Sequence, residues 1–157
     1  MGLVILDEQF IGQAIEAVRQ AKQEICLSSF KIELTDKPAG RNLKAFFDAL
    51  TERAAAGIRI QILFNWRGSE KSVPKTNKPT ALNLKSQKMD LRYLTGDRCC
   101  HAKILIVDRT RAILGSHNLS VRSISSNFEI SYLIPDPESV AELQGIFDRV
   151  FSTAKQI

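Results

Sequence analysis

The chain has 157 residues, of which 44% are hydrophobic and 25% are charged, with a formal net charge of +5 and a pI near 9.3. This length is enough for one compact domain with a sizeable core. No apolar stretch approaches the ~20 residues that cross a bilayer, so no transmembrane segment is expected. We predict a single globular domain over residues 1–157, whose positive charge favours an anionic partner.

The first third of the chain alternates helical and strand patterns. Apolar residues recur at helical spacing over residues 11–21, and Asp7 is placed to cap that helix. Alternating apolar residues predict a strand over residues 24–34. A second amphipathic helix follows, and Gly57 suits its C-terminal cap; its apolar face carries Leu43, Phe46, Phe47 and Leu50.

The middle of the chain contains one clear strand and one irregular segment. Apolar residues alternate strictly over residues 58–64, which is typical of a strand. Residues 65–79 show no periodicity and contain several turn formers, so they are expected to form a loop. Thr80 is placed to cap a short helix that ends near Gln87.

The last third contains mostly strand patterns. Arg109 and Thr110 are expected to make a tight connection between two of these strands, and Asp136 with Pro137 marks the start of a final helix. Consecutive strands late in a chain that begins with alternating helices and strands imply an α/β fold, with a mixed β-sheet flanked by helices on both faces. The strands are predicted over residues 90–94, 103–108, 111–114 and 128–134.

The cysteines and the N-terminus bear on compartment and on metals. The three cysteines, Cys26, Cys99 and Cys100, do not suggest a disulfide framework, which favours a reducing compartment. Cys99, Cys100 and His101 lack the second spaced ligand pair of a structural zinc site, so no metal site is predicted. No secretory signal is visible, so we expect a cytoplasmic location.

The most informative segment runs from His101 to Asn118. Its sequence, HAKILIVDRTRAILGSHN, resembles the HKD motif HxKxxxxDxxxxxxGSxN of the phospholipase D superfamily, and all six fixed positions match. The similarity to bacterial members continues through an NLxxRSxxxNFE run that ends at Glu129. It is close in the second half of the chain and extends to the first half only as a general pattern of elements. The fixed positions are His101, Lys103, Asp108, Gly115, Ser116 and Asn118.

The resemblance implies a phospholipase D-like fold and a phosphodiesterase that works through a phosphohistidine, with His101 as nucleophile and without a metal or other cofactor. One imidazole cannot both attack phosphorus and protonate the leaving oxygen. The chain has one HKD motif and is similar to the small single-motif members, which place two copies across a two-fold axis. We therefore expect a homodimer, in which His101 of the partner subunit is the general acid and base.

The spacing within the motif predicts which side chains meet. Residues two apart on a strand share a face, so His101 and Lys103 are expected to point into one site. Asp108 has the opposite parity and is expected to anchor the motif rather than to touch substrate. Ser116 and Asn118 follow Gly115 in the chain and can donate hydrogen bonds to a phosphate. The role of Gly115 itself is expected to be structural.

Two further residues have open roles. Glu129 lies in a predicted strand, where it can accept the other N–H of a histidine and orient it, as a glutamate near this position does in resembling enzymes. The alternative is an ordinary solvated residue. His117 fills the variable position of the motif; its parity favours packing or a contact at the rim, and a second acid–base group is the alternative.

A basic block follows the strand over residues 58–64. Its cations outnumber its single acid, Glu70, which fits a groove that follows a nucleic-acid backbone, and a tryptophan at its edge is placed to stack on a base. The alternative is a solvated, charged loop. The predicted nucleic-acid contacts are Trp66, Arg67, Lys71, Lys75, Lys78, Lys85 and Lys88.

These observations favour a metal-independent endonuclease acting on DNA or RNA. A phospholipase D or phosphatidyl-transfer enzyme is the first alternative, although the sequence shows no clear membrane-binding element. A catalytically inert nucleic-acid-binding module is the second, and the intact motif argues against it. The chain can also be the catalytic part of a larger protein. For the dimer interface, Leu119, Val121 and Ile124 are candidates, unless they belong to the core of one subunit.

Overall fold

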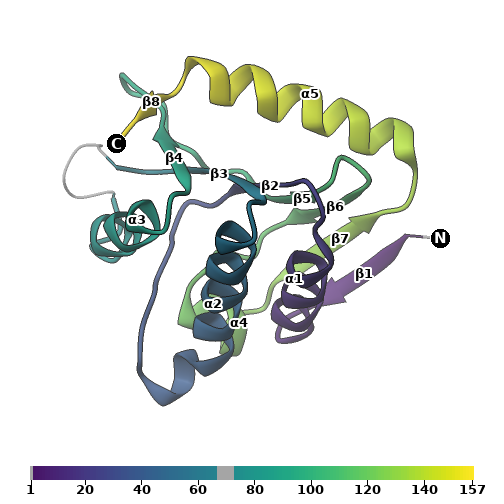
Figure 1. Cartoon of the computed structure of the whole chain (residues 1–157). Coiled ribbons are helices and arrows are strands. Elements are labelled where there is room, and N and C mark those ends of the chain that lie inside the picture. Colours follow the sequence, from purple (N-terminus) through teal and green to yellow (C-terminus); the bar gives the residue numbers. More distant parts are fainter. Residues whose placement is uncertain (1, 67–72) are drawn as a thin grey trace.

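The centre of the protein is a mixed, eight-stranded sheet, seen in a computed structural model that describes residues 2–66 and 73–157 (Figure 1). The strand order is β1-β7-β6-β5-β2-β3-β4-β8. β2 and β3 run parallel, as do β3 and β4, and the other neighbouring pairs are antiparallel. The strands are β1 Leu3–Leu6, β2 Glu24–Ser28, β3 Arg59–Phe64, β4 Asp90–Tyr93, β5 Lys103–Val107, β6 Arg111–Gly115, β7 Ile130–Ile134 and β8 Lys155–Gln156.

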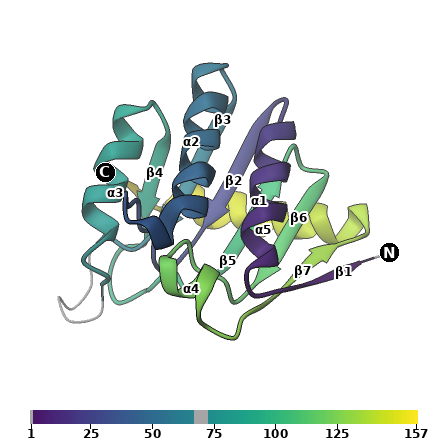
Figure 2. The same ribbon diagram turned by 90° about the horizontal axis from the view of Figure 1, so that it is seen from below.

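Helices cover both faces of the sheet. α1, α2 and α3 lie on one face and the long α5 crosses the other, as the two views in Figures 1 and 2 show. This confirms the predicted fold class. In the described residues no helix has the length and apolar character needed to cross a membrane. The helices are α1 Gln9–Gln20, η1 Pro38–Gly40, α2 Arg41–Ala55, α3 Asn77–Ser86, α4 Val121–Ser125 and α5 Pro137–Thr153.

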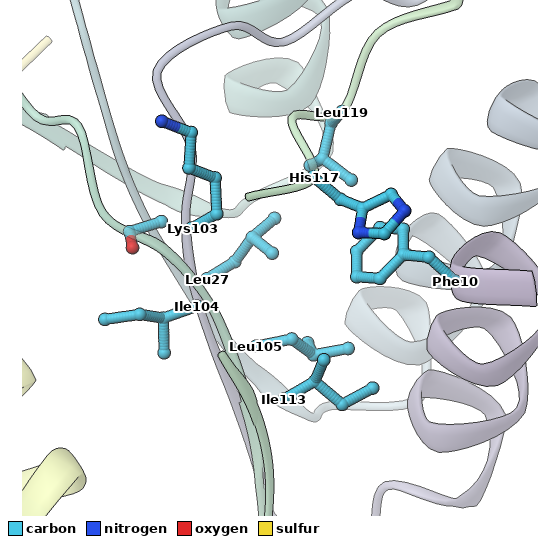
Figure 3. Close-up of a pocket in the computed structure, with 9 residues that line it drawn as sticks. Phe10, Leu27, Lys103, Ile104, Leu105, Ile113, His117 and Leu119 are labelled. Atoms are coloured by element: carbon cyan, nitrogen blue, oxygen red, sulfur yellow. The ribbon is translucent and has the colours of Figure 1, made fainter. Parts of the chain in front are cut away.

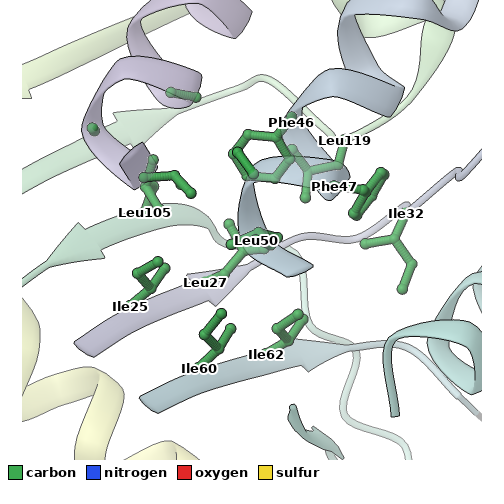
Figure 4. Packing of buried hydrophobic residues seen from close by; sticks show 14 of the residues in the cluster. Ile25, Leu27, Ile32, Phe46, Phe47, Leu50, Ile60, Ile62, Leu105 and Leu119 are labelled. Atoms are coloured by element: carbon green, nitrogen blue, oxygen red, sulfur yellow. The ribbon is translucent and has the colours of Figure 1, made fainter. Parts of the chain in front are cut away.

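Each face of the sheet has its own core. Because side chains alternate along a strand, Ile25 and Leu27 of β2 point toward α1 and α2, while Cys26 between them points toward α5. The larger core lies under α1 and α2, where Phe46 and Leu50 pack on the strands (Figure 4). The smaller core lies under α5. The alternation of side chains along a strand therefore supplies both cores.

The extents of two expected elements differ from the structure, and one observed strand was not expected. The strand expected over residues 24–34 ends at Ser28, because the following residues leave the sheet and Ile32 makes only an isolated bridge to Leu119. Helix α3 begins at Asn77, and Thr80 lies inside it, where its hydroxyl accepts a hydrogen bond from Leu34 N at 2.9 Å. Strand β1 was not expected, since its four apolar residues show no alternation.

The helix starts show one confirmed prediction and one error. Asp136 caps α5, and its carboxylate accepts a hydrogen bond from Ser139 N at 2.8 Å. Asp7 does not cap α1, which begins at Gln9 without a side-chain cap. Its carboxylate instead accepts a hydrogen bond from Glu129 N, at 2.7 Å. The Asp7 carboxylate therefore binds the residue that precedes β7 and not the start of helix α1.

Candidate active site

A tight hairpin folds the HKD motif back on itself. β5 and β6 pair antiparallel, with Lys103 opposite Gly115 at the open end and Val107 opposite Arg111 at the closed end. The connection runs over residues 108–110, one residue longer than the Arg109-Thr110 connection expected, and Asp108 and Arg109 have φ values of 52° and 57°. The two ends of the motif, thirteen or more positions apart along the chain, therefore meet at one edge of the sheet.

The imidazole of His101 and the amine of Lys103 are in contact. Lys103 Nζ lies 2.9 Å from His101 Nδ1, and it donates a hydrogen bond to the His101 carbonyl oxygen at 2.6 Å. The two side chains meet as expected, although Lys103 is the first residue of β5 and His101 lies outside the strand. His101 is exposed, whereas Lys103 is only 9% exposed. Burial lowers the pKa of Lys103, and the negative charge of Glu129 opposes that shift.

An aromatic ring borders this pair. The ring of Phe30 lies 5.3 Å from the His101 ring, centroid to centroid, and 5.9 Å from Lys103 Nζ. Phe30 follows β2, two residues after that strand ends, at the edge where β5 begins. No sequence pattern marks Phe30 as a site residue, because its neighbour in space, His101, is about seventy positions away along the chain.

Asp108 lies at the opposite end of β5 from His101. Its carboxylate accepts hydrogen bonds from the backbone N–H groups of Lys22, Gln23 and Glu24, at 2.8, 2.8 and 3.0 Å. Burial alone would raise the pKa of this carboxyl, but the three N–H groups together lower it. The position agrees with the expected anchor, since Asp108 ties the hairpin turn to the start of β2.

Ser116 and Glu129 form the second polar group of the site. The Ser116 hydroxyl donates to the Glu129 carboxylate and accepts from Ile130 N at 3.1 Å. The carboxylate also accepts from Ser123 Oγ at 2.7 Å and from Asn127 Nδ2 at 3.1 Å. Burial opposes ionisation of Glu129, which is 8% exposed, but these three donors hold its pKa below the ordinary value.

Glu129 does not meet the histidine of its own chain. In the described residues its side chain bonds to Ser116, Ser123 and Asn127, and none of its hydrogen bonds goes to His101. It is also not the solvated residue of the alternative prediction, because it is buried. Within one subunit the expected contact between Glu129 and a histidine is therefore not made, and the orienting role of Glu129 stays a prediction.

Asn118 is oriented by its carbonyl end. Its Oδ1 accepts hydrogen bonds from Lys31 N at 3.1 Å and from Ser29 Oγ at 3.4 Å. Its backbone N–H donates to Ser123 Oγ at 2.8 Å, so Ser123 links it to the Glu129 cluster. With Oδ1 held, the NH₂ group is left as the donor that an anion can use.

Gly115 is required by a neighbouring strand rather than by a ligand. A Cβ at this position would lie 2.1 Å from Ser131 Oγ and 2.5 Å from the carbonyl oxygen of Ile130. The absence of a side chain lets β7 approach β6 closely here. The expected structural role of Gly115 is therefore explained by strand packing.

His117 is a packing residue in this subunit, the role that its parity favours. It is 2% exposed, and its ring stacks on Phe10 with centroids 4.4 Å apart. Nδ1 lies 2.7 Å from Ser131 Oγ and Nε2 lies 2.9 Å from the Asp7 carbonyl oxygen. Burial lowers its pKa. Figure 3 shows the ring against Phe10 of α1, with the Lys103 amine pointing away from it.

The predicted basic block is divided by the structure. α3 runs back along the sheet, because its first residue contacts Phe30 and its end leads to β4, which lies parallel to β3. Lys75 and Lys78 therefore lie at the edge that holds His101. Lys85 and Lys88 lie at the other end of α3, where Lys85 Nζ donates to the Ile157 carbonyl oxygen at 2.6 Å. Arg67 and Lys71 fall outside the described residues.

Trp66 does not form an open platform for a base. Its ring packs edge-on to Phe64, with centroids 6.1 Å apart, and lies 6.5 Å from Tyr93. Lys78 Nζ lies 5.6 Å from its centroid. The residue is half-buried and packs against the larger core, and its stacking on a base stays a prediction.

The cysteines are free thiols. Burial raises the pKa of both Cys26 and Cys100 to about 11, which makes them poor nucleophiles, whereas Cys99 is exposed. Over residues 2–66 and 73–157, no group of three or more His, Cys, Asp or Glu side chains is arranged to hold a metal ion.

A comparison with known protein families gives a match that includes the HKD motif. Residues 14–151 match a family model described as cardiolipin synthase, PLD-like domain. The chain belongs to the phospholipase D superfamily. Its members are phosphodiesterases, and the resemblance to this superfamily seen in the sequence is thereby confirmed.

Curated relatives of this superfamily member include lipid enzymes. Phospholipase D Z of Dictyostelium discoideum is 26% identical over 147 residues, which is 89% of this chain and 35% of that protein. Cardiolipin synthase 1 of Bacillus cereus is 28% identical over 104 residues, 66% of this chain and 20% of that one. The chain thus spans at most about a third of these relatives.

Solved structures of the superfamily confirm the fold over the whole chain. Nuc from Salmonella typhimurium has a TM-score of 0.80 at 16% identity, and NucT from Helicobacter pylori has 0.81 at 15%. Both comparisons cover 100% of this chain and 99% of the other. Phosphatidylserine synthase from Haemophilus influenzae gives 0.71 at 14% identity, and the chain covers 39% of it.

Proposed function

We propose that this chain is a metal-independent nuclease that cleaves DNA or RNA as a homodimer, with His101 as the nucleophile. The observation that carries the proposal is the exposed imidazole of His101 in contact with the buried Lys103, at the edge of the sheet where Lys75 and Lys78 lie. An exposed nucleophile beside a buried cation suits attack on a phosphodiester, because the cation can stabilise the charge that develops on the phosphoryl oxygens.

The reaction has two balanced steps. In the first, a neutral His101 ring nitrogen attacks phosphorus, the bond to the leaving oxygen breaks, and the partner's His101 gives that oxygen a proton. In the second, the partner's His101 takes a proton from water, the resulting hydroxide attacks phosphorus, and the phosphorus–nitrogen bond breaks. Lys103 and the NH₂ group of Asn118 are proposed to donate hydrogen bonds to the nonbridging oxygens in both steps.

The second subunit is needed because one chain supplies one suitable imidazole. The other histidine, His117, is buried against Phe10 and bonded at both ring nitrogens. In a two-fold dimer the same residues approach from both sides, so Glu129, which does not reach His101 in its own chain, can accept an N–H from the partner's His101. This arrangement gives the buried carboxylate the orienting role expected from the sequence.

The sheet offers a surface for this second copy. On the face that carries α5, five apolar side chains of adjacent strands are each between 41% and 57% exposed. The register places them in two rows, since Val4 pairs with Tyr132 and Tyr132 with Leu114, while Leu6 pairs with Ile130. We name this surface the apolar strip; it consists of Val4, Leu6, Leu114, Ile130 and Tyr132.

The apolar strip adjoins the candidate site. Ile130 follows Glu129 directly, and its N–H donates to Ser116 Oγ, while Leu114 precedes Ser116 by two residues. A second copy that covers the strip would therefore bring its own motif next to this one. The interface candidates named from the sequence belong instead to the core of one subunit, which was the alternative. Leu119 and Ile124 are 1% and 4% exposed, and Val121 packs against the same core.

Lys75 and Lys78 support a nucleic-acid substrate, since both lie at the edge of the sheet that holds His101. Replacing both with Glu is expected to weaken DNA binding by at least tenfold at low salt. The salt dependence of binding should also become weaker, because a protein that makes fewer phosphate contacts releases fewer counterions when it binds. The matched control is Lys85→Glu with Lys88→Glu, which makes the same charge change at the far end of α3. Binding isotherms at several salt concentrations measure both. Equal losses in the two double variants would mean that only net charge matters.

A phospholipid substrate is the second candidate function. Two observations favour it: the curated relatives are a phospholipase D and cardiolipin synthases, and the apolar strip is an exposed surface that the sequence did not reveal. The hypothesis of nucleic-acid binding has a structural parallel, because the archaeal chromatin protein TrmBL2, described as binding DNA, shares the fold with a TM-score of 0.63 at 19% identity over 55% of that protein.

Incubation with labelled DNA, RNA and phosphatidylcholine vesicles, each with and without excess EDTA, separates these candidates. We expect cleavage of DNA or RNA, with rates in EDTA within about twofold of those without it, because the proposed nucleophile and acid are imidazoles. Release of choline from the vesicles without nucleic-acid cleavage would replace the nuclease by the lipid enzyme. Complete loss in EDTA, restored by a divalent ion, would contradict the mechanism.

A further inference from the structure

His101 is not held by the sheet. Strand β5 begins at Lys103, so the residues on either side of His101 lack strand partners. Side chains take their place. The Asn65 amide accepts a hydrogen bond from Cys100 N at 2.8 Å and donates to the Cys100 carbonyl oxygen at 2.9 Å. On the other side, Ser28 Oγ donates to the Ala102 carbonyl oxygen at 3.0 Å.

Asn65 also holds the aromatic wall of the site. Its Nδ2 donates to the Phe30 carbonyl oxygen at 3.1 Å, and the Phe30 ring contacts the His101 ring. A second amide supports the first, because Asn77 Nδ2 donates to the carbonyl oxygens of Phe30 and Asn65 at 2.9 and 3.0 Å. Asn77 Oδ1 in turn accepts from Ile32 N at 2.9 Å.

Both amides are buried, Asn65 at 4% and Asn77 at 0% exposure. A buried amide costs free energy unless its donors and acceptor are all used, and here they are. An apolar residue at position 65 would leave the N–H and C=O of Cys100 without partners, since no strand supplies them. The Asn65 side chain thus makes the two hydrogen bonds to Cys100 that a neighbouring strand would otherwise make.

We propose that Asn65 is a positioning residue for His101, which fixes the backbone before the imidazole and the Phe30 ring beside it, and that Ser28 does the same for the backbone after it. In-line attack needs the ring nitrogen close to phosphorus and aligned with the leaving oxygen, and a displacement of about 1 Å can cost about 100-fold in rate. The consequence for catalysis rests on the proposed function, whereas the consequence for the position of the His101 ring does not.

The first test replaces Asn65 with Asp. The new carboxylate keeps the acceptor for Cys100 N but sets an oxygen against the two carbonyl oxygens that the amide had bonded. We expect kcat to fall by about 100-fold while KM stays within about threefold, because substrate-binding groups are not altered. The matched control is Gln144→Glu, the same amide-to-acid change at a residue that is 2% exposed and lies on α5, on the opposite face of the sheet. Its kcat is expected to stay near that of the unsubstituted protein.

A second measurement does not depend on any substrate. The chain has two histidines, so the ring C–H signals of His101 and His117 can be assigned with a single His101→Ala variant. In Asn65→Asp the His101 signal is expected to shift or broaden while that of His117, packed between Phe10 and β7, stays in place. Ser28→Ala, a milder change, is expected to move the same signal less and to lower kcat by about threefold to tenfold.

The histidine signals and kcat together test the positioning role of Asn65. An unchanged His101 signal in both variants, or a kcat near that of the unsubstituted protein, would overturn the positioning role. Equal shifts of both histidine signals in folded variants would show an effect that is not selective for the His101 segment and would also overturn it. If Asn65→Asp does not fold, Ser28→Ala decides alone by the same criteria. A selective His101 shift in a protein that cleaves no phosphodiester would support the positioning of His101 and reject the proposed function.

Discussion

Replacement of His101 with Ala is expected to reduce turnover by at least about 10⁴-fold and to leave the fold intact. The imidazole is the proposed nucleophile, and neighbouring groups cannot substitute for the bond that it forms with phosphorus. The side chain is exposed and contacts mainly Lys103 and Phe30, so little packing is lost. Single-turnover rates, with thermal unfolding of the same samples, measure both effects. Residual activity above about a tenth of the original would reject the assignment.

His117→Ala is the matched control for this experiment. The residue is buried, stacked on Phe10 and bonded to Ser131 and to the Asp7 carbonyl. Its removal is expected to lower the free energy of unfolding by about 2–4 kcal/mol, through lost packing and unpaired polar groups. Turnover by the folded fraction should change little. A folded but inactive His117→Ala protein would instead make His117 the missing acid, and would remove the reason for a second subunit.

Mixing subunits is expected to have the second large effect. If the site contains one imidazole from each subunit, a mixed dimer of normal and His101→Ala chains holds only one and is inactive. A fourfold excess of the variant leaves about one fifth of the normal chains in fully normal dimers after random exchange. Activity per normal chain should fall to that fraction. A value that stays constant as the variant is added would show that each chain works alone.

The apolar strip provides a structural test of the same dimer. Tyr132→Glu places one charge from each chain in the proposed interface, and we expect the dissociation constant to rise by at least 100-fold, with loss of activity at micromolar concentration. Leu82→Glu is the control, because Leu82 is 50% exposed on α3, away from the strip. Sedimentation of both variants measures the effect. A Tyr132→Glu protein that stays dimeric and active, but no longer binds vesicles, would assign the strip to a membrane.

The sequence by itself determined the family and the central pair of the site. Six fixed positions at set spacing identify the HKD motif, and the two-residue spacing of His101 and Lys103 predicts that their side chains meet, although only Lys103 lies in a strand. The same alternation separates the residues of the two cores, and Asp136 before Pro137 marks the start of α5. These features depend on neighbours within a few positions, so a single sequence can show them.

Features that depend on strand order were not accessible in this way. Asp7 accepts a hydrogen bond from Glu129 N because β1 lies next to β7 in the sheet, although the two strands are separated by almost the whole chain. Asn65 meets Cys100 because β3 and the segment before β5 end at the same edge of the sheet. No local period links such residues, since their contact follows from the order in which strands assemble.

Burial and exposure of single residues were likewise decided by the tertiary structure. His117 and Trp66 lie at positions where the sequence permits function, yet both are taken up by packing with aromatic neighbours. The four described lysines of the basic block are divided because α3 runs away from the site and carries its two ends to opposite edges of the sheet. The apolar strip shows the same principle in reverse. Its residues occupy alternate positions of β1, β6 and β7, and they are exposed because α5 leaves this part of the face uncovered. The pattern of a strand does not show where a helix will lie.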